Sequence, residues 1–222
     1  MGDSFEVNTR WQGKWDNNEV RWHKDVVNEN LETFFLDLVP SGESTEGRTV
    51  FVPLCGKTLD MRWLYDKGFT VIGVEAIERA VLEFFEEQKM EYDVEKVGAF
   101  DVYTSKNGKI KLFQGNLFDF TEDLVGGKLD HSWDRGSLVA IDKDTRQRYG
   151  ELFSSVMKPI STGLLEVFEY DSSLHSEQPF PIFPETIEAV FSPSFGFKEL
   201  RKQEDSKSSF PRTKITYKMS RK

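Results

Sequence analysis

The sequence contains one cysteine, Cys55, among 222 residues. A single cysteine excludes an internal disulfide and fits a reducing compartment. No run approaches the roughly 20 apolar residues that a membrane-spanning helix needs, and the N-terminal segment lacks the apolar core of a signal peptide. We therefore expect a cytoplasmic protein that has no membrane partner.

Two glycine-rich phosphate motifs are also missing. Neither G-x-G-x-x-G nor G-x-x-x-x-G-K-[ST] occurs in the sequence, which disfavours a nucleotide held through its phosphates. An excess of basic residues is absent as well, since 29 Lys and Arg stand against 38 Asp and Glu and give a net charge of -9. A negative field repels phosphate backbones, so we expect no nucleic-acid partner.

What is present suits one α/β domain. Hydrophobic residues make up 38% of the chain, enough for a sizeable core. Short apolar, β-branched runs predict strands, and apolar residues spaced three or four apart predict helices. Strands are predicted at residues 49–54, 70–75, 110–115, 129–134, 163–170, 197–202 and 213–219. Helices are predicted at residues 26–38, before Gly68, and at 77–88, 144–157 and 184–191.

The alternation of these segments predicts a Rossmann-like fold with helices on both faces of the sheet. The expected sheet has seven strands and is mostly parallel. The last two strands have only a short loop between them and can pair as an antiparallel hairpin, which supplies an antiparallel end strand. We expect a single domain overall, with a polar surface loop at residues 40–47.

The carboxyl ends of the predicted parallel strands are where a ligand should bind. Gly56 follows the first strand and permits a tight turn, and Glu75 ends the second strand nineteen positions later. A carboxylate at that place can accept hydrogen bonds from both hydroxyls of a ribose, although it can also cap the helix that follows. With the phosphate motifs absent, this pair favours a cofactor that has a ribose but no phosphates.

Two further segments follow predicted strands. Asn116 to Asp119 can frame an adenine edge, with Leu117 or Phe118 against the ring, or it can simply supply a Leu/Phe pair to the core. Trp133 to Gly136 can face the middle of a cleft, or it can hold a surface ion pair between Asp134 and Arg135. Spacing alone does not separate these readings.

Tryptophan is concentrated before the first predicted helix. Trp11, Trp15 and Trp22 lie in a polar segment, which is unusual because disordered tails are poor in aromatic residues. Aromatic faces bind cations well. The alternative is that these indoles only cover the edge of the sheet.

Four motifs, in this order and spacing, resemble those of the thiopurine S-methyltransferases. The similarity extends from about Trp11 to the last strand, and the combination of P-L-C-G-K with W-D-R-G is its most specific part. The motifs are W-Q-G-K-W at 11–15, V-F-V-P-L-C-G-K at 50–57, V-I-G-V-E at 71–75 and W-D-R-G-S-L-V-A-I at 133–141.

This resemblance implies a class I methyltransferase that uses S-adenosyl-L-methionine and releases S-adenosyl-L-homocysteine. Residues 46–222 would form its core, and residues 1–45 would contribute an N-terminal segment and helix covering the active site. The implied cofactor site consists of Trp11, Trp15, Leu54, Gly56, Glu75, Asn116, Leu117 and Arg135. Trp22 and Arg135 would contact the substrate, and Arg135 and Asp134 would be the catalytic residues. The family also uses a second arginine near the C-terminus to approach an anionic substrate, a part for which Lys207 and Arg212 are the candidates here.

The resemblance further implies a monomer that methylates a small thiol or thiopurine-like acceptor by direct in-line transfer. Arg135 would favour an anionic acceptor, while Asp134 would orient Arg135 or take a proton. Two alternatives remain open. One is a non-catalytic relative that binds the cofactor as a sensor or scaffold, and the other is a methyltransferase for selenium, tellurium or halide acceptors.

Other candidates for chemistry are weaker. Cys55 can be read as a nucleophile, but it follows a buried strand and no His or Asn can be assigned to it, which favours a packing role. The three histidines are His23, His131 and His175, and their scattered positions argue against a metal site.

Overall fold

The computed structural model describes residues 3–39, 42–206 and 208–222, with side chains from residue 9 onward. The chain divides into two compact units. Unit 1 lies within residues 1–28 and 45–120, and unit 2 lies within residues 29–44 and 121–222. Both units combine strands with helices, so the predicted α/β class is confirmed.

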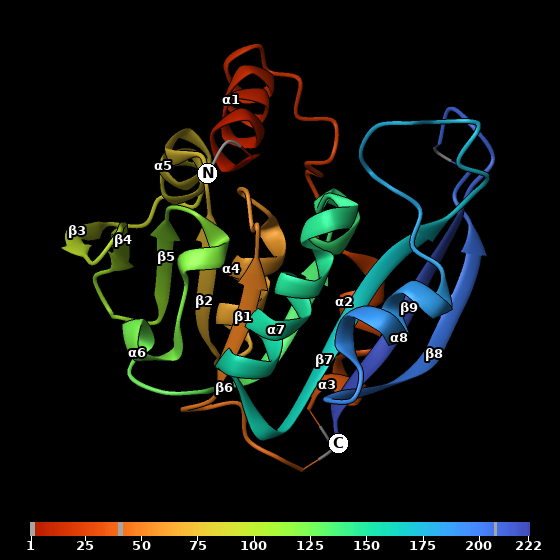
Figure 1. The fold of residues 1–222 in the computed structure, drawn as a ribbon. Coiled ribbons are helices and arrows are strands. Elements are labelled where there is room, and N and C mark those ends of the chain that lie inside the picture. Colours follow the sequence, from red (N-terminus) through yellow and green to blue (C-terminus); the bar gives the residue numbers. More distant parts are fainter. Residues whose placement is uncertain (1–2, 40–41, 207) are drawn as a thin grey trace. The chain divides into compact units, whose positions relative to one another are not determined.

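Unit 1 has three helices, one 3₁₀ turn and five strands. They are α1 (Asp3–Asp16), α4 (Leu59–Asp66), α5 (Glu78–Glu87), η1 (Leu117–Asp119), β1 (Thr49–Pro53), β2 (Thr70–Glu75), β3 (Tyr92–Val97), β4 (Phe100–Ser105) and β5 (Ile110–Gln114). The strand order is β3-β4-β5-β2-β1. Strand β2 pairs in parallel with β1 and β5, whereas β4 pairs antiparallel with β5 and β3 (Figure 1).

Unit 2 contains four strands and mostly short helices. They are α2 (Glu29–Thr33), α3 (Phe35–Leu38), α6 (Glu122–Val125), α7 (Arg146–Val156), α8 (Pro184–Phe191), η2 (Leu138–Ala140), η3 (Lys143–Thr145), β6 (Leu129–Arg135), β7 (Met157–Glu169), β8 (Phe195–Glu204) and β9 (Thr213–Arg221). The order is β6-β7-β9-β8, with β6 and β7 parallel. The antiparallel pairing of β8 with β9 confirms the predicted hairpin.

The predicted number and direction of strands were wrong in detail. Nine strands occur in the described residues, and four of the seven pairings within the units are antiparallel. The sequence did not reveal β3 and β4. Four of the six residues of β3 are exposed, so this edge strand has no apolar face that a hydrophobic pattern can show.

The predicted helix at 26–38 is instead two short helices, α2 and α3. Phe34 lies between them with φ -102° and ψ 19°, outside the helical range. The Thr33 hydroxyl donates to the Glu29 carbonyl at 2.7 Å, a contact that bends helices. Leu31 and Leu38 are nevertheless buried, so the apolar spacing did identify residues of the core.

The other predicted helices are present as α4, α5, α7 and α8, and Pro184 occupies the first turn of α8 as expected. Helix α1 was not predicted, because its sequence is largely polar and the few apolar residues at helical spacing, Val7, Trp11 and Trp15, give a weak helical pattern. The predicted loop begins at residues 40–41, outside the described chain, and residues 42–47 form no helix or strand.

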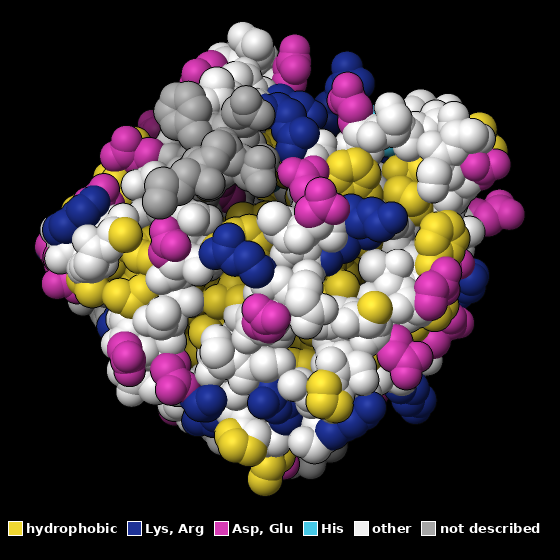
Figure 2. Space-filling model, viewed as in Figure 1, with side chains coloured by type: hydrophobic (Ala, Val, Ile, Leu, Met, Phe, Trp, Pro, Cys, Tyr) yellow, Lys and Arg dark blue, Asp and Glu magenta, His cyan; other side chains and the backbone are white. Residues whose placement is uncertain are grey.

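None of the helices in the described ranges is long and apolar enough to cross a membrane. On the face shown in Figure 2, Lys and Arg side chains are interspersed with Asp and Glu.

Candidate functional site

The turn after β1 in unit 1 is closed by Glu75. Leu54 and Gly56 both have left-handed backbone, with φ +41° and +52°. This turns the Gly56 N–H toward Glu75, whose Oε2 accepts it at 2.8 Å. The Cys55 N–H donates to the Val74 carbonyl at 3.0 Å and continues the pairing of β1 with β2. The predicted residues Leu54, Gly56 and Glu75 therefore lie together.

The Glu75 carboxylate is buried, with 7% of the residue exposed. Its Oε1 accepts the Ile77 N–H at 3.0 Å, just before α5, so the side chain also serves the helix start that was the alternative reading. Burial raises the Glu75 pKa, and hydrogen bonds from the amides of Ile77, Gly56 and Ala76 counteract that rise. A carboxylate has about four acceptor positions, and the Gly56 and Ile77 N–H groups within hydrogen-bond distance use two of them, so two hydroxyl donors can still bind.

Three tryptophans gather next to this turn. Trp11 and Trp15 are one turn apart on α1, so both point from the same face of the helix. The Trp22 ring lies edge-on to both, with centroids 5.0 Å from Trp11 and 6.1 Å from Trp15. A Cβ placed on Gly56 would lie 3.7 Å from Cζ2 of Trp15. The indole of Trp15 thus stands against the same turn that Glu75 closes.

Arg79 on α5 holds the tryptophan segment in place. Its guanidinium donates to the Trp15 carbonyl at 2.6 Å and to Asn18 Oδ1 at 2.5 Å. The same side chain pairs with Glu83 at 2.6 Å. Sequence reasoning missed this role of Arg79, because Trp15 and Asn18 are 64 and 61 positions away from it.

The segment after β5 lies beside Glu75. The Gly115 N–H donates to the Glu75 carbonyl at 2.9 Å, and the Gln114 amide donates to the Ala76 carbonyl at 2.8 Å. Asn116 caps the turn η1 by accepting the Phe118 N–H at 3.2 Å. Leu117 is only 3% exposed, so its core role is real whether or not it also contacts a ligand.

In unit 2, Asp134 near the end of β6 is a buried acceptor. Its Oδ1 accepts the N–H groups of Ser137 at 3.1 Å and Leu138 at 3.3 Å. Its Oδ2 accepts the Tyr149 hydroxyl at 2.7 Å. Burial raises the pKa of Asp134 to about 6, against the lowering effect of these donors. The carboxylate fixes the turn that follows Arg135.

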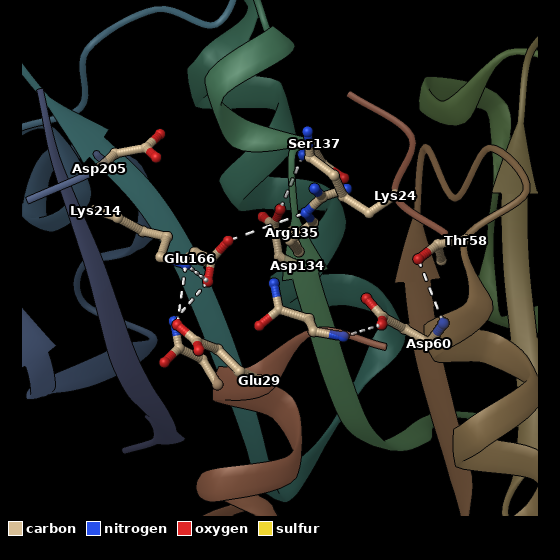
Figure 3. Close-up of polar contacts among 12 residues, drawn as sticks. Lys24, Glu29, Thr58, Asp60, Asp134, Arg135, Ser137, Glu166, Asp205 and Lys214 are labelled. Carbon is tan, nitrogen blue, oxygen red and sulfur yellow. Dashed lines mark hydrogen bonds and ion pairs between the residues drawn. The ribbon is translucent and has the colours of Figure 1, made fainter. Parts of the chain in front are cut away.

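Arg135, at the end of β6, has a side chain 21% exposed and faces a carboxylate that sequence reasoning missed (Figure 3). Its Nε lies 4.0 Å from Oε1 of Glu166 on β7. Glu166 is buried, and its Oε2 accepts from the Asn30 amide at 2.8 Å. The sequence does contain a sign of this residue, because Glu166 is the one acidic residue within the apolar run G-L-L-E-V-F of β7.

The structure does not assign either suggested C-terminal basic residue, Lys207 or Arg212, to binding an acceptor. Lys207 lies outside the described residues. Arg212 pairs with Asp205, with Nε 2.7 Å from the carboxylate, and its guanidinium lies 4.0 Å from the Phe168 ring centre. Lys214 is the basic residue of β9 nearest to Glu166, at 3.9 Å.

The remaining candidates have structural surroundings. Cys55 is buried, and desolvation followed by the charge of Glu75 raises its pKa well above the usual value, so it stays a protonated thiol. The Nδ1 atom of His131 lies 2.8 Å from the Thr162 hydroxyl. In the part of the chain that is described, no three His, Cys, Asp or Glu side chains are placed to hold a metal ion.

Solved structures with the same fold are methyltransferases. Magnesium protoporphyrin IX methyltransferase from Synechocystis PCC 6803, with bound S-adenosylhomocysteine, matches with a TM-score of 0.68 and 15% identity over 99% of this chain and 100% of that one. The 1,6-didemethyltoxoflavin-N1-methyltransferase of Burkholderia thailandensis matches with a TM-score of 0.63 and 13% identity, over 99% of this chain and 89% of that one. At such identities the likeness shows the fold.

Sequence relatives are more specific. Thiopurine S-methyltransferase of Bos taurus is 36% identical over 184 residues, which are 82% of this chain and 74% of the relative. The probable thiopurine S-methyltransferase of Danio rerio is 35% identical over 189 residues, covering 84% and 80%. The thiopurine S-methyltransferase family model matches residues 7–221. The chain therefore belongs to the thiopurine S-methyltransferase family and is an S-adenosylmethionine-dependent methyltransferase.

Proposed function

We propose that this chain transfers a methyl group directly from S-adenosyl-L-methionine to a small sulfur acceptor such as a thiol or a thiopurine-like thione. The observation that carries the proposal is the turn in unit 1, where Glu75, Gly56 and the Trp15 indole meet. A buried carboxylate with free acceptor positions suits a ribose. The Trp15 ring reaches the same turn with its Cζ2 atom, and aromatic side chains attract cations such as a sulfonium.

The proposed cofactor residues follow from this geometry. Glu75 would accept the two ribose hydroxyls, and the left-handed turn at Leu54 and Gly56 would let the backbone come close to the ligand. Asn116 and Leu117 lie on the segment that hydrogen-bonds alongside Glu75, where the adenine would be expected. Trp11 supports Trp15 through the shared cluster with Trp22. When bound, the cofactor supplies an electrophilic methyl group.

The acceptor would be recognised through charge. The Arg135 guanidinium attracts a thiolate or the anionic form of a thione, and orientation matters more here than proton transfer because such a nucleophile is already largely ionised. Asp134 receives three hydrogen bonds that hold the turn after Arg135. We therefore assign it to positioning Arg135 rather than to proton uptake. Trp22 remains our proposed neighbour of the acceptor, and residues 1–45 the proposed cover.

The test is calorimetric titration with S-adenosylhomocysteine, followed by a methyl-transfer assay on arenethiols and thiopurines. We expect binding and transfer to sulfur. Folded protein that binds no S-adenosylhomocysteine contradicts the proposal. Binding without transfer to any thiol, thione, selenol or halide indicates a sensor or scaffold instead. The same sample serves to check the monomer that we propose, by light scattering, and labelled protein in cells would check a cytoplasmic location.

A further inference from the structure

A row of polar side chains crosses the sheet of unit 2. Strand pairing sets Arg135 of β6 beside Glu166 of β7, Glu166 beside Thr216 of β9, and Thr216 beside Arg201 of β8. Directly paired residues project from the same face of a sheet. Glu166 and Thr216 are buried, although buried sheet positions are usually apolar. This row is therefore a built polar feature inside an apolar layer.

Helix α2 places its own polar groups on the row. Asn30 is fully buried, donates to Glu166 Oε2 at 2.8 Å and accepts from Arg201 at 2.7 Å. Glu29 lies 3.6 Å from Lys214 and 3.9 Å from Arg201. The cluster thus combines the cations Arg135, Arg201 and Lys214 with the carboxylates Glu166 and Glu29. Figure 3 shows four of these residues, namely Arg135, Glu166, Lys214 and Glu29.

Glu166 acts on Arg135 through charge. Its 4.0 Å separation from Arg135 Nε is longer than a hydrogen bond, whereas its contact with Asn30 is a hydrogen bond. The carboxylate is therefore anchored by α2 and offsets the positive charge of Arg135 without clamping the guanidinium. Since Glu166 is buried, solvent screens this effect less than it would on the surface.

We infer that Glu166 is a specificity residue, which limits affinity for acceptors that carry a second negative charge and so selects acceptors whose only anionic group is the reacting sulfur. The inference rests on the proposed function, because it assigns Arg135 to the acceptor. Removing the Glu166 charge would leave the three cations of this cluster with one carboxylate, Glu29. The more positive cluster would raise the affinity for a dianionic acceptor more than the affinity for a monoanionic one.

The test compares thiophenol with its para-carboxylate, two arenethiols that differ by one negative charge. Dissociation constants are measured by calorimetry with the S-adenosylhomocysteine complex, and KM and kcat are measured with S-adenosylmethionine. The variants are Glu166→Gln, which keeps an acceptor for Asn30, and Glu166→Asp, which keeps the charge. The matched control is Asp130→Asn. Asp130 lies at the start of β6 and pairs with Lys158, so this variant also removes one negative charge from an ion pair. That position is about 16 Å along the strand from Arg135.

For Glu166→Gln we expect roughly three- to tenfold tighter binding and lower KM for the carboxylate acceptor, with thiophenol changed by less than about twofold. Glu166→Asp and Asp130→Asn should each keep the wild-type ratio of the dissociation constants for the two acceptors. Lys214→Met changes the charge in the opposite sense and should weaken binding of the carboxylate acceptor. This variant keeps the inference testable even if Glu166→Gln fails to fold.

An unchanged ratio in both Glu166→Gln and Lys214→Met would overturn the inference, as would equal shifts for both acceptors, which indicate a structural effect. Failure of the proposed function looks different. In that case the wild type binds the arenethiols but transfers no methyl group, and the ratio of dissociation constants still decides the role of Glu166. Absence of acceptor binding to any variant would overturn both.

Discussion

Glu75 in unit 1 and Glu166 in unit 2 are both buried carboxylates on strands, but they are stabilised by different groups. Glu75 accepts backbone N–H groups from Gly56 and Ile77. Glu166 depends on side chains, with an amide from Asn30 and cations from Arg135 and Lys214. Backbone donors stay when side chains mutate, so the surroundings of Glu75 are fixed by the fold. The surroundings of Glu166 can be retuned one residue at a time.

The sharpest way to break this comparison is Glu75→Ala. If the backbone-held carboxylate binds the ribose through two charge-assisted hydrogen bonds, affinity for S-adenosylhomocysteine should fall about a thousandfold. Calorimetry measures the loss, and circular dichroism shows whether the variant is folded. The control is Glu86→Gln, an exposed acid on α5. A folded Glu75→Ala protein that binds within threefold of wild type would remove Glu75 from the cofactor site.

Asp134 is an intermediate case, since it is buried and accepts both backbone N–H groups and a phenol. Burial raises its pKa from 3.8 to about 6. Between these two pH values the folded protein keeps a proton on Asp134 that the unfolded chain has lost. The stability of wild type relative to Asp134→Asn should therefore be greatest below pH 4. It should fall by about 3 kcal/mol as the pH rises from about 4 to 6.

Urea unfolding of wild type and Asp134→Asn at several pH values measures this difference. A difference that stays level between pH 4 and 6 means that the folded carboxyl titrates normally. The Tyr149→Phe variant is a useful companion, because it removes one donor that lowers the Asp134 pKa and should extend the window to higher pH.

Arg135→Met tests the side-chain half of the comparison. Loss of a charged donor to the acceptor should lower kcat/KM for thiophenol about thirtyfold. Binding of S-adenosylhomocysteine should weaken much less, unless Arg135 also contacts the cofactor as the family resemblance implies. Parallel kinetics and calorimetry distinguish the two roles. Unchanged kcat/KM would show that Arg135 does not attract the acceptor.

The smallest expected effect belongs to Gly56→Ala. The added Cβ would lie 3.7 Å from Trp15, an ordinary contact, so the cost should come from the left-handed backbone at φ +52°. We expect about 1 kcal/mol of lost stability, together with a severalfold loss of cofactor affinity because the added methyl group stands at the turn that we propose approaches the ligand. Gly115→Ala offers the contrast, since its Cβ would meet the Phe100 ring at 2.6 Å. Equal losses in the two variants would contradict this explanation.

The separation in sequence between interacting residues explains which parts of the candidate site could be predicted. Glu75 and its partner Ile77 are two positions apart, and Gly56 follows the neighbouring strand, so strand prediction alone placed them at one edge. Glu166 and Asn30 are 136 positions apart, and no periodicity links such residues. The family resemblance supplied Arg135 but not the carboxylate beside it.

The same limit applies to the fold. Buried strands such as β1 and β2 are continuous apolar runs and were predicted within one residue. The hairpin of β3 and β4 has an exposed edge strand, and the break at Phe34 depends on a local hydrogen bond of Thr33. These features arise from exposure and backbone geometry, to which hydrophobic spacing is insensitive.

The three indoles that pack edge to edge in unit 1 also give the protein an optical property. Because the ring centroids are 5.0 and 6.1 Å apart, we expect their electronic transitions to couple and to give a paired positive and negative band in circular dichroism. Because Arg79 ties the Trp15 backbone to the helix that follows Glu75, that band reports on the proposed cofactor turn. We therefore expect cofactor binding at this turn to change the band in the unlabelled chain.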